Sequence, residues 1–91
     1  MTLAAYTVIF SKLAEERFDR IIRADRRLGE QIARAISRLA QNPERGKSLQ
    51  GASWKGYRKY RSGNYRIIYR IEKVRLVVFV LTLGDRKDIY D

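Results

Sequence analysis

Neither cysteine nor histidine occurs anywhere in the 91 residues of this chain. Without cysteine the chain can form no disulfide and no thiolate metal site, which fits a reducing compartment. Without histidine it also lacks the commonest metal ligand and the commonest general base near neutral pH. We therefore expect no metal and no cofactor. Any catalysis has to use Lys, Arg, Tyr, Asp or Glu.

Long apolar runs are also missing. No apolar stretch approaches the roughly 20 residues that cross a bilayer, and Met1–Phe10 lacks the basic region and apolar core of a signal peptide. We therefore expect a cytoplasmic protein with no membrane partner. A chain of 91 residues is long enough for one modest core and too short for two. We expect a single domain over residues 1–91.

Basic residues, by contrast, are abundant. Twenty Lys and Arg against ten Asp and Glu give a formal net charge of +10. Such an excess predicts attraction to polyanions and binding that weakens as salt is added. A merely solubilising surface is the alternative interpretation. In so small a domain the charge favours a nucleic acid or an acidic protein as partner.

The stretch Gly56–Arg70 predicts a β-hairpin. Basic residues alternate with aromatic or aliphatic ones on both sides of residues 62–64, where glycine and asparagine tolerate the positive φ of a tight turn. Side chains alternate between the two faces of a strand. One face should therefore be apolar, and the other should carry three cations at close quarters, namely Lys59, Arg61 and Arg66. Such a face is suited to binding phosphate.

The chain before the hairpin predicts one strand and two helices. β-Branched and aromatic residues indicate a strand over residues 5–10. Ser11 is placed to cap a helix, and Asp25 is placed to cap a second one that runs to about Gln41. Apolar residues recur at helical spacing in both. Pro43 should end the second helix, because the residue before a proline is excluded from helical geometry.

The rest of the pattern completes an α+β fold. Residues 44–54 lack periodicity and predict a loop, whereas Arg75–Leu83 is apolar on both faces, as in a central strand that Gly84 ends. The element order is β-α-α-β-β-β. We expect an antiparallel-rich curved sheet with an N-terminal helical hairpin on one face. The opposite face of the sheet should stay open and carry the three cations.

Four segments together carry a family resemblance: Leu49–Gly51, Lys59–Tyr69, Val77–Leu81 and Gly84–Tyr90. They resemble the RelE/ParE toxin superfamily, closest to the RelE-type mRNA interferases, and the resemblance covers nearly the whole chain. Its members are the toxins of type II toxin–antitoxin pairs. RelE-type toxins enter the ribosomal A site and cut mRNA, whereas ParE-type toxins share the fold and inhibit DNA gyrase without cleaving RNA.

The resemblance implies an RNase site made of five residues. Lys59 would assist proton transfer from the attacking 2′-hydroxyl, while Arg61 and Arg66 would hold and neutralise the scissile phosphate. Arg86 would lie close to the leaving group, and Tyr90 would stack on or orient the mRNA base. Fixed guanidinium groups stabilise the extra negative charge of such a transition state.

Asp85 departs from this pattern, since many relatives have histidine or another basic residue there. Three hypotheses therefore stand. The first is a ribosome-dependent endoribonuclease, which binds ribosome and mRNA; the second is a ParE-like gyrase inhibitor that acts by binding alone. The third is a nucleic-acid-binding module or an inactive member of the superfamily. All three imply a cognate acidic antitoxin, partly disordered when free, that forms a hetero-oligomeric complex on the basic surface.

Overall fold

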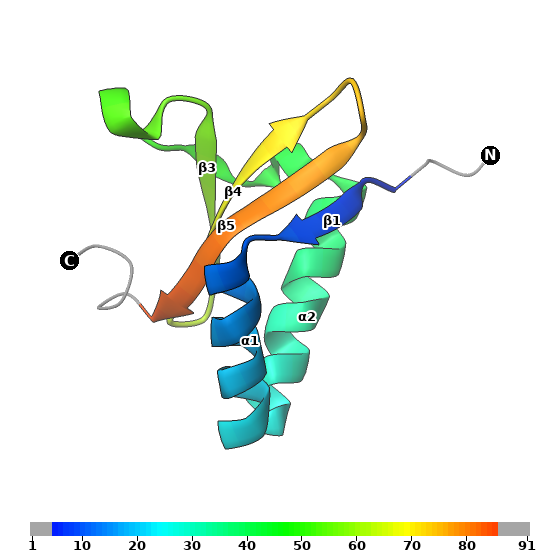
Figure 1. Cartoon of the computed structure of the whole chain (residues 1–91), viewed down its shortest axis with the longest axis vertical. Helices are drawn as coiled ribbons and strands as arrows, with labels where there is room; N and C mark the ends of the chain where they lie inside the picture. Colours follow the sequence, from blue (N-terminus) through cyan, green and yellow to red (C-terminus); the bar gives the residue numbers. More distant parts are fainter. Residues whose placement is uncertain (1–4, 86–91) are drawn as a thin grey trace.

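Two helices pack against a five-stranded mixed sheet (Figure 1). The computed structural model describes residues 5–85. The helices are α1 (Lys12–Ala24) and α2 (Arg26–Gln41). The strands are β1 (Thr7–Phe10), β2 (Lys47–Ser48), β3 (Tyr57–Ser62), β4 (Tyr65–Glu72) and β5 (Val77–Asp85). There are also two short 3₁₀ helices, η1 (Pro43–Arg45) and η2 (Ala52–Trp54). The expected α+β fold is confirmed.

The sheet order is β1-β5-β4-β3-β2. β5 pairs in parallel with β1 and antiparallel with β4, and the other neighbours are antiparallel. The expectation that the last strand is central is confirmed, but Gly84 does not end it, because pairing with β4 continues to Asp85. In the β4–β5 pair the register shifts between Ile68 and Tyr69 of β4. Such a bulge increases the local twist and curves the sheet.

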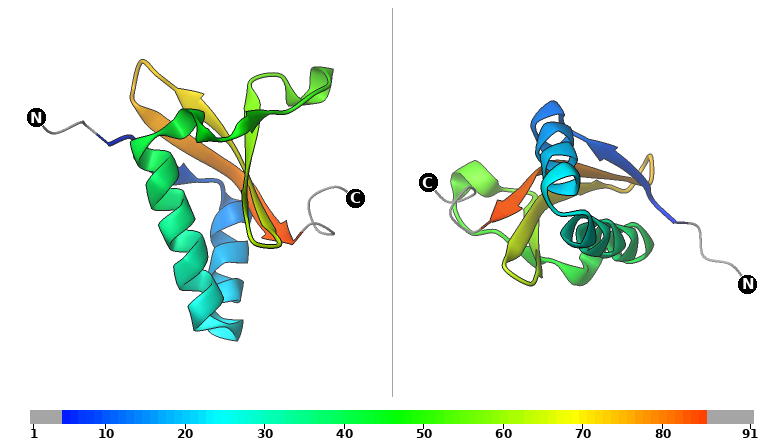
Figure 2. Two further views of the ribbon diagram at one scale, coloured as in Figure 1. Left: turned by 180° about the vertical axis from the view of Figure 1, so that it is seen from behind. Right: turned by 90° about the horizontal axis from the view of Figure 1, so that it is seen from below.

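Both predicted helix caps are confirmed. The Ser11 hydroxyl accepts a hydrogen bond from the Ala14 N–H at 3.0 Å. Asp25 alone separates the two helices. Its N–H donates to the Ile21 carbonyl at 2.8 Å, and its carboxylate accepts from the Leu28 N–H at 3.2 Å. A single residue thus ends α1 and begins α2, and the two helices lie side by side (Figure 2).

The helices approach each other closely at Gly29, which is buried on α2. A Cβ at this position would lie 2.5 Å from Cγ1 of Ile22 and 3.1 Å from its Cα. Ile22 therefore packs closely against α2, and it stays 38% exposed.

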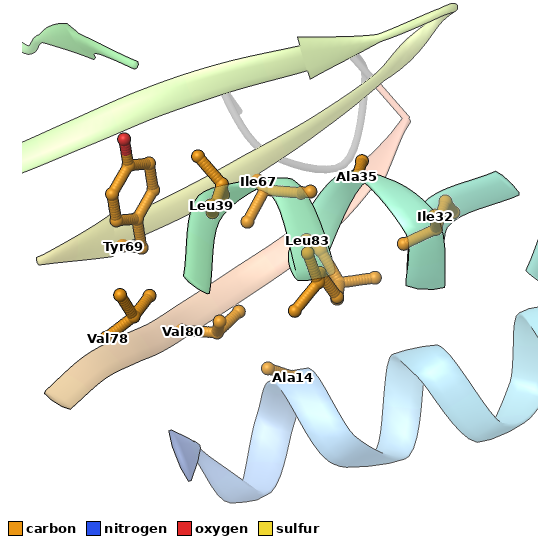
Figure 3. Packing of buried hydrophobic residues seen from close by; sticks show 10 residues of the cluster. Ala14, Ile32, Ala35, Leu39, Ile67, Tyr69, Val78, Val80 and Leu83 are labelled. Carbon is orange, nitrogen blue, oxygen red and sulfur yellow. The ribbon is translucent and has the colours of Figure 1, made fainter. Parts of the chain in front are cut away.

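The core lies between the helical hairpin and the inner face of the sheet (Figure 3). The apolar stripe of α2 and the predicted apolar face of the β3–β4 hairpin both contribute to it. Its buried members are Ala14, Ile32, Ala35, Ile36, Leu39, Ile67, Tyr69, Val78, Val80 and Leu83.

The hydroxyl of Tyr69 ties the sheet to the segment that follows α2. It donates to the Pro43 carbonyl at 2.5 Å and accepts from the Gly46 N–H at 2.9 Å. Burial raises the pKa of Tyr69, and the bond from Gly46 partly offsets the effect. Gly46 leaves no room for a side chain, because a Cβ there would lie 2.7 Å from the Lys59 carbonyl oxygen.

The short strand β2 corrects the expectation of a loop over residues 44–54. Lys47 pairs with Lys59 and Ser48 with Arg58, at the edge of the sheet beyond β3. Two residues are too few to show the alternating pattern that identifies a strand. The residue before β2, Gly46, donates its N–H to the hydroxyl of Tyr69, which lies 23 positions further along the chain.

Replacing Gly46 with alanine should destabilise the protein by about 1–3 kcal/mol, because the added methyl group has no space beside the Tyr69 hydroxyl and ring. Chemical denaturation measures the loss. The Tyr69→Phe variant loses two hydrogen bonds but also vacates part of that space. In the Tyr69→Phe background, Gly46→Ala should therefore cost less than in the wild type. Equal losses in the two backgrounds would contradict the steric explanation.

Candidate phosphate-binding site

One cleft at the outer edge of β3 brings together the three cations predicted on the hairpin. Its volume is about 400 Å³, and it is lined by Arg45, Lys47, Lys59, Tyr60, Arg61 and Arg66. Among these described lining residues five are cations and none is acidic. Such a lining attracts anions. We call this cleft the cation cleft.

Like charges face each other across neighbouring strands of the cation cleft. Arg61 lies directly opposite Arg66 in the β3–β4 pair, and Lys47 lies directly opposite Lys59 in the β2–β3 pair. Like charges at opposed positions destabilise a sheet. An anion bound between them would remove this repulsion, and guanidinium groups bind phosphate oxygens through paired hydrogen bonds.

Arg66 differs from the other cations because it is only 7% exposed. Its neighbour on the same face, Ile68, is fully buried, which corrects the expectation that this face stays open. β4 lies between β3 and β5, and side chains of β4 and β5 pack together on this face. The Arg70 guanidinium, for example, lies over the Phe79 ring at 4.7 Å. A charge in such a poorly hydrated position acts on a bound anion more strongly than an exposed one does.

Arg45 and Lys47 were not predicted as site residues. They belong to η1 and β2 and flank Gly46, whose carbonyl accepts a hydrogen bond from the Arg58 guanidinium at 2.7 Å. Their side chains are exposed, while the backbone between them is fixed to the sheet. The sequence signal was weak, because a basic residue on each side of one glycine is common in surface loops.

The two remaining predicted site residues, Arg86 and Tyr90, lie outside the described residues. Asp85 is the last residue described, half-buried and opposite Tyr65 at the end of β5. The residue before it, Gly84, is paired with Arg66. β5 thus brings the chain alongside the strand that carries the buried arginine.

Within residues 5–85 there is no group of three acidic, histidine or cysteine side chains arranged to hold a metal ion. Neither helix described there is long and apolar enough to cross a membrane.

Comparison with known proteins identifies the family. A family model described as the ParE toxin of the type II toxin–antitoxin system parDE matches residues 8–90. The chain belongs to this toxin family. It is thereby a toxin of the RelE/ParE superfamily, as its residues had suggested. A search of curated proteins finds no match for this toxin.

Solved structures show the same fold. The toxin–antitoxin complex RelBE2 from Mycobacterium tuberculosis contains a chain that is 28% identical to this toxin, with a TM-score of 0.79 over 93% of this chain and 95% of that one. The isolated RelE toxin of E. coli gives 25% identity and a TM-score of 0.73 over 89% and 84%. The YoeB/ParE toxin from Agrobacterium tumefaciens has a TM-score of 0.76 over 88% and 98%, but its 20% identity shows the fold alone.

Removing one of the opposed charges should stabilise the free toxin. Arg61→Gln eliminates the repulsion with Arg66, and we expect the free energy of unfolding to rise by roughly 0.5 kcal/mol at low salt. Thermal unfolding measures the change. Arg34→Gln is the matched control, because it removes the same charge from an exposed position on α2. The difference between the two variants should shrink with added salt. An equal rise in both would assign the effect to net charge alone.

Proposed function

We propose that this toxin is a ribosome-dependent endoribonuclease that cleaves mRNA in the A site. The observation that carries the proposal is the cation cleft, in which exposed Arg61 and buried Arg66 face each other beside Lys59. A toxin that only binds a protein target has no need of like charges held at such close quarters. A nuclease needs them to stabilise a phosphate that gains negative charge in its transition state.

The chemistry follows from that arrangement. The 2′-oxygen of the ribose attacks the adjacent phosphorus, the bond from phosphorus to the 5′-oxygen breaks, and the products are a 2′,3′-cyclic phosphate and a 5′-hydroxyl. Because nucleophile and phosphate belong to the same nucleotide, correct positioning supplies much of the rate. Arg61 and Arg66 hold the phosphate oxygens, and Lys59 assists removal of the 2′-hydroxyl proton.

The proposal assigns the last two roles to residues beyond β5. Arg86 stabilises the leaving 5′-oxygen, and Tyr90 orients the mRNA base. What supports this assignment is their resemblance to the family motif, together with the pairing of Gly84 with Arg66 where β5 ends. Asp85 adds a negative charge directly before Arg86 in the sequence, and this charge lowers the affinity of the site for phosphate.

The alternative is a gyrase inhibitor that acts by binding alone. The observation that favours it is the description of the matching family model, which names a ParE toxin. In that case the cation cleft would be a binding surface with no catalytic role.

The decisive experiment maps mRNA 5′ ends in bacteria that express the toxin from a tightly controlled promoter. For the wild type we expect cuts within translated reading frames. Arg66→Ala and Arg86→Ala should abolish the cuts, since each removes a cation from the reacting phosphate. Arg34→Ala, exposed on α2 outside the cation cleft, should retain them.

Arg66 is buried, so the folding of Arg66→Ala has to be verified by its thermal unfolding. Arg86→Ala provides an independent test of the same chemistry. Growth arrest without new mRNA ends, together with DNA damage signalling, would reject the nuclease and support the gyrase inhibitor.

We further propose that a cognate acidic antitoxin covers the cation cleft. The net charge of +10 supports this, and the solved relative from Mycobacterium tuberculosis is a toxin–antitoxin complex. Because the attraction is electrostatic, we expect the dissociation constant of the pair to rise with salt. Calorimetric titration at several salt concentrations measures it. An affinity that does not depend on salt would contradict the electrostatic origin.

A further inference from the structure

We propose that Arg45 and Lys47 form a second phosphate subsite, which holds the RNA backbone one phosphate away from the scissile one. The proposal rests on the proposed function, which places the scissile phosphate at Arg61 and Arg66. The subsite is the end of the cation cleft that lies furthest from β5.

The width of the cation cleft is the first argument. Lys47, Lys59 and the residues of β4 lie on three adjacent strands. Neighbouring strands are about 4.8 Å apart, so the Cα of Lys47 lies roughly 10 Å from β4 across the sheet. A phosphodiester carries one negative charge, so a single one cannot balance the cations at both ends of this row. A chain of phosphates can, and RNA supplies one.

The charges around Arg45 and Lys47 are the second argument. Lys47 lies directly opposite Lys59, so two cationic side chains share this end of the cleft. The acidic residue nearest in sequence, Glu44, has its carboxylate 3.2 Å from Arg58 and 3.3 Å from Lys73. Glu44 therefore pairs with cations that do not line the cleft.

The rigid backbone beneath these two side chains is the third argument. The Gly46 N–H donates to the buried Tyr69 hydroxyl, and its carbonyl accepts from Arg58. A peptide fixed on both sides holds the neighbouring Arg45 and Lys47 at defined positions. Binding groups on a pre-organised backbone lose less entropy when the ligand arrives.

Single-stranded RNA fits this surface better than an acidic protein segment does. The lining residues form a basic track, and a basic groove that follows the backbone is typical of sites for single-stranded nucleic acid. The end formed by Arg45 and Lys47 is also continuous with the cations proposed to hold the scissile phosphate. One strand can therefore occupy both.

Fluorescence anisotropy with a labelled single-stranded DNA oligonucleotide tests the subsite, because DNA lacks the 2′-hydroxyl and is not cleaved. Three proteins are compared over a series of salt concentrations: the wild type, Arg45→Gln/Lys47→Gln, and the control Arg27→Gln/Arg34→Gln. The control removes two charges from exposed positions on α2 outside the cation cleft. Thermal unfolding of each verifies that the fold is intact.

The subsite variant should bind more weakly than the control at low salt. Each phosphate contact on a single strand contributes about 0.7 to the slope of log affinity against log salt, so loss of one contact should make the slope shallower by about 0.7. In ribosome-dependent cleavage the variant should raise KM and leave kcat close to the wild-type value, since the subsite binds a part of the RNA that does not react.

Three results would overturn the subsite. The first is a slope for the variant equal to that of the wild type. The second is an equal change in the control. The third is weaker binding of the antitoxin with unchanged binding of the oligonucleotide, which would make this end of the cleft a protein contact. Failure of the nuclease itself gives a different result: the wild type then makes no mRNA cuts, while the slopes still differ between the two double variants.

Discussion

The basic side of this toxin depends on one buried hydroxyl. Tyr69 is part of the core, yet its oxygen bonds to two backbone groups of the segment that follows α2. These bonds hold η1 and β2 against the edge of the hairpin, and the lack of a side chain at Gly46 permits the close approach. An unsatisfied buried polar group is costly, so the bonds keep the segment in place. The core thereby determines where the cations of Arg45 and Lys47 lie.

The cation cleft lies on strands whose inner face is well packed and whose outer face carries opposed like charges. Beneath it the hairpin presents a well-packed apolar face to α1 and α2. On the other side of the same strands, opposed pairs of like charge weaken the sheet, and one guanidinium of those pairs is almost completely buried. Local rules of sheet stability are commonly broken where a ligand has to bind. A polyanion, whether RNA or an antitoxin, would therefore both occupy the cleft and stabilise the fold.

Local chemistry in the sequence predicted most of the architecture. Ser11 and Asp25 identify helix ends because a cap needs only neighbouring backbone groups. The turn after Ser62 could be predicted because Gly63 adopts the positive φ that a tight turn needs. β2 and the burial of Arg66 were not predictable in this way, since both depend on strands distant in the chain. The cluster of Lys59, Arg61 and Arg66 followed from strand periodicity, whereas the roles proposed for Arg86 and Tyr90 came from family resemblance alone.

The position of β5 determines when the sheet can close during synthesis of the chain. β5 is made after every other strand, yet it lies between β1 and β4 and pairs Thr7 with Val77. Until it emerges from the ribosome, β1 has no partner in the sheet and β4 is open along one edge. The buried environment of Arg66 forms only when that edge is closed. The cation cleft can therefore reach its final form only after β5 has been made.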